Sequence, residues 1–89
     1  MVYYDSSVEK DVKKGNIPTE IVKLFINAFS ALDNTKDLNL FDIKSLKSSD
    51  ETDYYRLRKG KYRAIFFMKD DDFYVQTIAK REDVYKKWQ

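Results

Sequence analysis

Four arginines carry the strongest chemical signal in this chain. They are Arg56, Arg58, Arg63 and Arg81, and all four lie in the second half of the sequence. The stretch 54–69 contains no acidic residue, although the whole chain has a formal net charge of only +2. A guanidinium is a rigid fork of hydrogen-bond donors that matches phosphate oxygens. The arginines therefore favour a phosphate-like anion as the ligand.

The chain contains no histidine and no cysteine. This composition excludes imidazole bases, thiolate nucleophiles, disulfides and the commonest zinc ligands. Proton transfer would have to use a tyrosine such as Tyr85, a lysine or a nearby carboxylate. The ordinary pKa of tyrosine and of lysine is about 10, and a crowded cationic cluster lowers both.

The residues from Tyr54 to Met68 predict a β-hairpin. Aromatic and β-branched side chains flank Lys59-Gly60, which we expect to form a two-residue turn. The resulting pairs would be Arg58 with Lys61, Leu57 with Tyr62, Arg56 with Arg63, and Tyr55 with Ala64.

Side chains of a strand alternate between the two faces of a sheet. Arg56, Arg58, Lys61 and Arg63 should therefore share one face of the predicted hairpin. Like charges opposite one another destabilise a sheet, so this face is expected to meet an anion. The other face would carry Tyr55, Leu57, Tyr62, Ala64 and Phe66.

The remaining elements place this hairpin in an α+β fold of one domain, residues 1–89. We expect an N-terminal strand, two helices, an antiparallel three-stranded meander and a short C-terminal helix. The clearest helix runs from Pro18 to Leu32, and Asn34 supplies a stop signal. Residues 35–53 are expected to be irregular. The apolar stripe of this helix consists of Ile17, Ile21, Leu24, Phe25, Ala28 and Leu32.

The sequence does not determine how the last strand of the meander, 73–80, is aligned with the strand before it. A two-residue loop at Asp70-Asp71 puts Lys80 opposite Lys61, and a three-residue loop through Asp72 puts Arg81 there. Either register adds a cation to the cluster. The three aspartates lack the ligand spacing of a calcium loop, so a solvated turn is expected.

A cationic face of this kind fits two activities on nucleic acid. It can hold the chain, with arginines as counter-charges and aromatic rings as stacking surfaces. It can also cleave RNA without a metal, using the RNA's own 2′-hydroxyl as the nucleophile and arginines to stabilise charge on the phosphorus oxygens.

The segment Tyr54–Phe66 resembles the arginine-rich hairpin of the RelE/ParE superfamily of bacterial toxins. Ile78–Tyr85 is similar to the family's closing arginine and Val-Tyr motif, and Leu46-Lys47 to the element that precedes the hairpin. The order of elements matches over essentially the full length. Lys80 stands where many members have histidine, and Ser48 where glycine is frequent.

The resemblance implies a toxin of a toxin–antitoxin pair that cleaves mRNA in the ribosomal A site (70S) by 2′-hydroxyl attack, with no metal and no cofactor. By position, Arg63 and Arg81 would stabilise the scissile phosphate, and Tyr85 would orient the RNA or aid proton transfer. Arg56 and Arg58 occupy strand positions where members of the family carry basic residues that bind RNA or take part in proton transfer. Further RNA contacts would come from Lys44, Lys47, Lys61 and Lys80.

The resemblance also implies partners and alternatives. A small cognate antitoxin that wraps the protein would neutralise it. The cationic face and the exposed apolar surface of the helix from Pro18 to Leu32 favour an acidic, partly disordered partner. One alternative is a ParE-like inhibitor that binds DNA gyrase and has no nuclease activity. Another is a degenerate toxin that only titrates antitoxin. No apolar run is long enough for a membrane span and the N-terminus lacks the regions of a signal peptide, so a cytoplasmic protein is expected.

Overall fold

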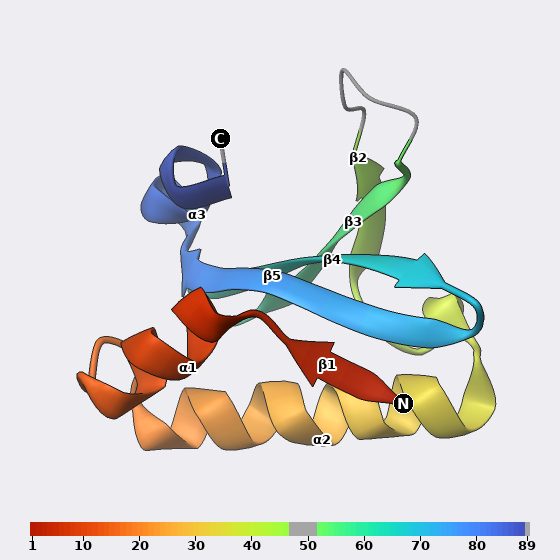
Figure 1. Cartoon of the computed structure of the whole chain (residues 1–89), viewed down its shortest axis with the longest axis horizontal. Coiled ribbons are helices and arrows are strands. Elements are labelled where there is room, and N and C mark those ends of the chain that lie inside the picture. The colour runs from red at the N-terminus through yellow and green to blue at the C-terminus, as the bar shows by residue number, and fades with distance from the viewer. Residues whose placement is uncertain (47–51, 89) are drawn as a thin grey trace.

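The computed structural model describes residues 1–46 and 52–88, with side chains up to Val84. One mixed five-stranded sheet has the strand order β1-β5-β4-β3-β2. Helices α1 and α2 lie against one face of this sheet, here called the inner face, and α3 lies beyond the other, the outer face (Figure 1). The predicted α+β class and the order of its elements are confirmed. In the described part of the chain, no helix is long and apolar enough to cross a lipid bilayer.

A side-chain cap marks the start of α1, and a left-handed residue marks the end of α2. The Asp5 side chain accepts a 3.1 Å hydrogen bond from the Ser7 backbone N–H and so caps α1. Helix α2 continues past Asn34, the predicted stop, and ends where Lys36 adopts a left-handed conformation with φ 57°. The bounds are Ser6–Lys13 for α1, Thr19–Thr35 for α2 and Arg81–Trp88 for α3.

The sheet is larger than the predicted meander by one strand. Residues 43–46, which were expected to be irregular, form an edge strand that pairs antiparallel with the first hairpin strand. The predicted short N-terminal strand forms the other edge, and it pairs parallel with the last strand. The strands are β1 Val2–Tyr4, β2 Ile43–Leu46, β3 Tyr54–Lys59, β4 Tyr62–Lys69 and β5 Asp72–Lys80.

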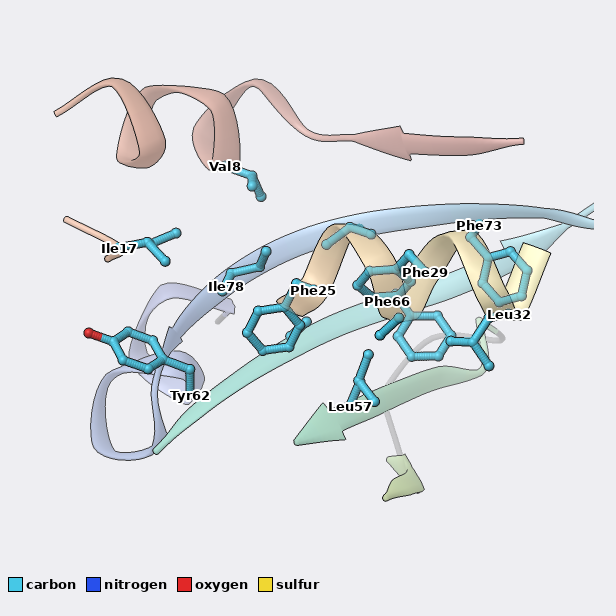
Figure 2. Packing of buried hydrophobic residues seen from close by; sticks show 13 residues of the cluster. Val8, Ile17, Phe25, Phe29, Leu32, Leu57, Tyr62, Phe66, Phe73 and Ile78 are labelled. Carbon is cyan, nitrogen blue, oxygen red and sulfur yellow. The ribbon is translucent and has the colours of Figure 1, made fainter. Parts of the chain in front are cut away.

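Aromatic rings fill the space between α2 and the inner face. Phe29 meets Phe66 edge to face, with ring centroids 5.2 Å apart, and Phe73 lies beside both. Figure 2 shows these rings between the helix and the strands. Burial of such large side chains gives a short chain most of its folding energy. Leu24, which we placed on the same helical stripe, is instead 47% exposed.

The hairpin turn lies one residue later than the sequence predicted. Lys59 pairs with Tyr62, so Gly60-Lys61 forms the two-residue loop and Arg58 lies opposite Arg63. Gly60 has φ 59°, and glycine takes the first position of the loop in one of the two favoured hairpin turns. Each pairing therefore shifts by two residues. Because the alternation has a period of two, Arg56, Arg58 and Arg63 still share one face, whereas Lys61 moves into the turn.

A β-bulge decides the register of the last strand. Phe66 pairs with Val75 and Ile65 with Thr77, so Gln76 has no partner across the strands. Of the two loops that the sequence left open, the structure has the two-residue loop at Asp70-Asp71, but the extra residue moves the end of β5 by one position.

The consequence of the bulge appears where β5 meets α3. Lys80 pairs with Tyr62, and the Arg81 backbone N–H donates a 3.0 Å hydrogen bond to the Lys61 carbonyl. The two-residue loop therefore brings Arg81 to this point, which the sequence linked to the three-residue loop.

Helix α3 is held on the outer face by a small apolar cluster. Val84 is fully buried and packs with Ile65 and Ala79, which point outward from β4 and β5. Leu46 and Tyr54 complete this contact from β2 and β3. The cluster fixes the start of α3, and hence Arg81, beside the hairpin arginines.

Candidate RNA-binding and catalytic site

A cleft of about 360 Å³ opens where β4, β5 and α3 meet at the hairpin turn. We call it the cationic cleft, because five of its seven lining residues are basic. It contains Arg58, Arg63, Lys61, Lys80 and Arg81 from the predicted site. The complete lining is Arg58, Gly60, Lys61, Arg63, Lys80, Arg81 and Glu82.

Arg63 is the most unusual residue of the cleft. It is only 7% exposed, and among the described residues it has no ion pair or side-chain hydrogen bond. Its cross-strand neighbour is Arg58, another cation. Burying a charge is costly unless a partner compensates it. A bound anion in the cleft would supply that partner.

Arg58 and Arg56 share a carboxylate that the sequence analysis did not consider. Arg56 Nη2 lies 3.7 Å from Asp42 Oδ1, and Arg58 Nη1 lies 4.0 Å from Asp42 Oδ2. Asp42 precedes β2, and its carbonyl accepts a 3.1 Å hydrogen bond from the Arg58 backbone N–H. Asp42 therefore lies beside two of the predicted arginines, and no described carboxylate forms an ion pair with Arg63.

The structure does not bring every predicted site residue into the cleft. The side chain of Arg56 is 12% exposed, its Nε is buried without a hydrogen bond, and it does not line the cleft. Lys44 is exposed on β2, directly opposite Arg56. Tyr85 belongs to α3, but its side chain lies outside the described residues, and Lys47 lies outside them entirely.

Glu82 is a lining residue that sequence reasoning missed. Its position directly after Arg81 was the available signal, but whether its side chain lies in the cleft depends on the start of α3 and on the bulge.

Among the described side chains, no three His, Cys, Asp or Glu groups lie close enough together to hold a metal ion.

A row of aromatic rings on the outer face was missed as well. Tyr3, Tyr74, Phe67 and Tyr54 are successive cross-strand neighbours on β1, β5, β4 and β3. Their ring centroids are 5.1, 4.9 and 5.8 Å apart in that order. The sequence shows these residues, but the alignment of the four strands depends on the register.

Comparison with known proteins gives one curated relative and several similar structures. The relative is a protein of Methanocaldococcus jannaschii that bears the provisional name toxin RelE1. It is 38% identical over 82 residues, which are 89% of this chain and 87% of the relative. No family model matches the chain.

Two solved structures show the same fold. The RelB–RelE antitoxin–toxin complex of Methanococcus jannaschii contains a chain that is 26% identical, with a TM-score of 0.76 over 98% of this chain and 99% of that one. The archaeal RelE–RelB complex of Pyrococcus horikoshii gives 24% identity and a TM-score of 0.70 over 90% and 92%. With its arginine hairpin, its fold and this relative, the chain belongs to the RelE family of toxins.

Proposed function

We propose that this protein is an endoribonuclease toxin that cuts mRNA in the ribosomal A site. The unpaired, buried Arg63 in the cationic cleft carries the proposal, because it is preorganised for an anion and has no described partner in the protein. Membership of the RelE family supports a toxin role. A target on the ribosome also implies that the protein acts in the cytoplasm.

In the proposed reaction, the 2′-hydroxyl of the RNA attacks the adjacent phosphorus in line with the departing 5′ oxygen. Arg63 and Arg81 stabilise the negative charge that develops on the phosphorus oxygens, because guanidinium groups stay protonated and donate in pairs. Arg58, Lys61 and Lys80 hold the neighbouring phosphates. Tyr85 orients the RNA or takes part in proton transfer.

The partner that we propose is a cognate antitoxin that neutralises the toxin. The similar structure from Methanococcus jannaschii is a RelB–RelE antitoxin–toxin complex, and the one from Pyrococcus horikoshii is a RelE–RelB complex. An acidic segment of the antitoxin would complement the cationic cleft by charge. Stoichiometric co-purification with the product of an adjacent gene tests this partner, and a protein that always purifies alone would contradict it.

Primer extension on an mRNA during translation in vitro tests the nuclease function. We expect ribosome-dependent cuts from the wild type and a loss of about 10²- to 10³-fold in cutting rate for Arg63→Ala, because one transition-state donor is removed. Lys23→Ala, an exposed lysine on α2, is the matched control and should cut at the wild-type rate.

Two outcomes would contradict the nuclease function. One is an intact mRNA with folded wild-type protein, and the other is Arg63→Ala that cuts as fast as the wild type. A supercoiling assay then separates the remaining explanations. Inhibition of gyrase without RNA cuts would indicate the ParE-like activity, and inactivity in both assays would indicate a degenerate toxin.

A further inference from the structure

The cationic cleft contains a single acid among its described lining residues. This acid is Glu82, the second residue of α3, and the other charged residues that line the cleft are arginines and lysines. Glu82 is exposed and forms no ion pair with the described residues. Glu82 thus lies among the basic residues of the cleft without forming an ion pair with any of them. It would therefore face any ligand that these residues bind.

The helix dipole alone does not explain Glu82. Acidic side chains stabilise the first turn of a helix, and α3 has two of them, Glu82 and Asp83. Asp83 lines a different cavity, together with Asn16, Ile17 and Tyr62. The two carboxylates therefore have the same relation to the helix, but only Glu82 lies in the cationic cleft.

The proposed reaction requires a base, and Glu82 is the only carboxylate among the described residues that line the cleft. Arginine is always protonated, and ordinary lysine and tyrosine side chains hold their protons at neutral pH. A carboxylate is an established general base, and it is deprotonated under the same conditions. Asp42 is another acid close to the hairpin arginines, but it lies against Arg56 and Arg58 and does not line the cleft.

We infer that Glu82 is the general base of RNA cleavage, which rests on the proposed nuclease function. Its carboxylate takes the proton of the 2′-hydroxyl while the 2′ oxygen forms a bond to phosphorus. The bond from phosphorus to the 5′ oxygen breaks, and that oxygen takes a proton from water. The products are a 2′,3′-cyclic phosphate and a 5′-hydroxyl, and Glu82 returns its proton to solvent.

The experiment compares Glu82→Gln with Asp83→Asn in the translation assay. Glu82→Gln keeps the shape of the side chain, and we expect its single-turnover cutting rate to fall about 10²- to 10⁴-fold. Its binding to programmed ribosomes should stay within about twofold of the wild type, because a base acts in the chemical step. Asp83→Asn removes the same helix-dipole charge and should cut at the wild-type rate.

The pH profile separates a base from a structural residue. The wild-type cutting rate should fall at acidic pH as the carboxylate becomes protonated, and Glu82→Gln should lack this acidic limb. Glu82→Asp, which keeps a carboxylate, should recover part of the rate and the limb.

Several results would overturn the role of Glu82. They are wild-type cutting by Glu82→Gln, an equal loss in Asp83→Asn, a loss of ribosome binding in Glu82→Gln, or an acidic limb that persists in Glu82→Gln. These results leave the nuclease function standing, since the wild type still cuts. A wild type that cuts no mRNA would instead remove the nuclease function, and the role of Glu82 with it.

Discussion

Arg63 combines two properties that are each unfavourable in a folded protein. It is a buried cation, and it lies opposite another cation, Arg58, without a described acidic partner. Both properties cost folding energy. Binding of an anion would compensate this cost, and in the proposed function that anion is the scissile phosphate.

Replacement of Arg63 by methionine should therefore stabilise the free protein. Methionine keeps the aliphatic volume and removes the buried charge, and we expect the free energy of unfolding to rise by about 1 kcal/mol. Urea unfolding followed by circular dichroism measures it. Arg58→Met is the control, because the Arg58 side chain is 53% exposed and its removal should change stability by less than half as much. A destabilised Arg63→Met would show that the guanidinium supports the fold.

At the scale of elements, the aromatic row on the outer face connects four strands. The rings of Phe67 and Tyr74 are nearly parallel, with an interplanar angle of 8° and centroids 4.9 Å apart. Cross-strand aromatic pairs contribute beyond the area that they bury. The row therefore fixes the register of β1, β5, β4 and β3 at the end of the sheet away from the cationic cleft.

A double-mutant cycle on Phe67→Ala and Tyr74→Ala should give a coupling energy of about 0.5 to 1.5 kcal/mol. Unfolding in urea of the two single variants and the double variant supplies the cycle. Tyr3 and Tyr54 lie at opposite ends of the row, so the same cycle on that pair should give a coupling near zero. Equal coupling in both cycles would mean that the contact between neighbouring rings is not its source.

The sequence predicted those elements whose signals are local. Leu57, Ala64 and Phe66 were assigned to the buried face of the hairpin because alternation has a period of two, and an error of two residues in the turn leaves it intact. β2 was missed because its burial follows no alternation: Ile43 and Leu46 are half-buried, and the two residues between them are exposed. The bulge at Gln76 was missed because it depends on tertiary contacts, among them a 3.3 Å hydrogen bond from Ser7 Oγ to the Gln76 carbonyl.

In the candidate site too, the residues with a local sequence signal were predicted, and those that depend on tertiary contacts were not. Arg63 and Arg58 follow from the hairpin pattern alone, and the structure adds their direct pairing. Arg81 needed the start of α3, which depends on Val84 packing against Ile65 and Ala79. Asp42 and Glu82 come from other elements, and no local pattern links them to the hairpin.

At the scale of the whole molecule, a charged contact joins the helical layer to the sheet. Near the C-terminal end of α2, Asp33 accepts a 2.8 Å hydrogen bond from Lys36 Nζ, which also donates to the Asp71 carbonyl in the β4–β5 turn. The Lys36 ammonium, and next the terminal amine of Met1, lower the pKa of Asp33. The contact thus connects the stability of the fold to pH.

The sign of this effect follows from the lowered pKa. The pKa of an aspartate side chain in an unfolded protein is about 3.9. As the pH falls toward this value, Asp33 therefore binds more protons in the unfolded state than in the folded state, where its pKa is lower. The stability that Asp33 contributes is therefore present at neutral pH and is lost on acidification through the folded-state pKa. Asp33→Asn should have a lower urea midpoint than the wild type at pH 7, and the difference should shrink at pH 3.

The control for this measurement is Asp53→Asn, an exposed carboxylate ahead of β3. We expect its midpoint to follow the wild type at both pH values. A difference between Asp33→Asn and wild type that stays the same at pH 7 and pH 3 would show that charge is not the origin of the contribution of Asp33.

The bulge at Gln76 makes the length of β5 as important as its composition. Before Gln76 the strand points one set of side chains toward α2, and after it the count is offset by one, so Ile78 faces the core and Ala79 faces α3. Loss of one residue here would exchange those two positions and move Arg81 away from Lys61. An insertion or deletion of a single residue within β5 should therefore move Arg81 out of the cationic cleft, even where it hardly changes the composition of the strand.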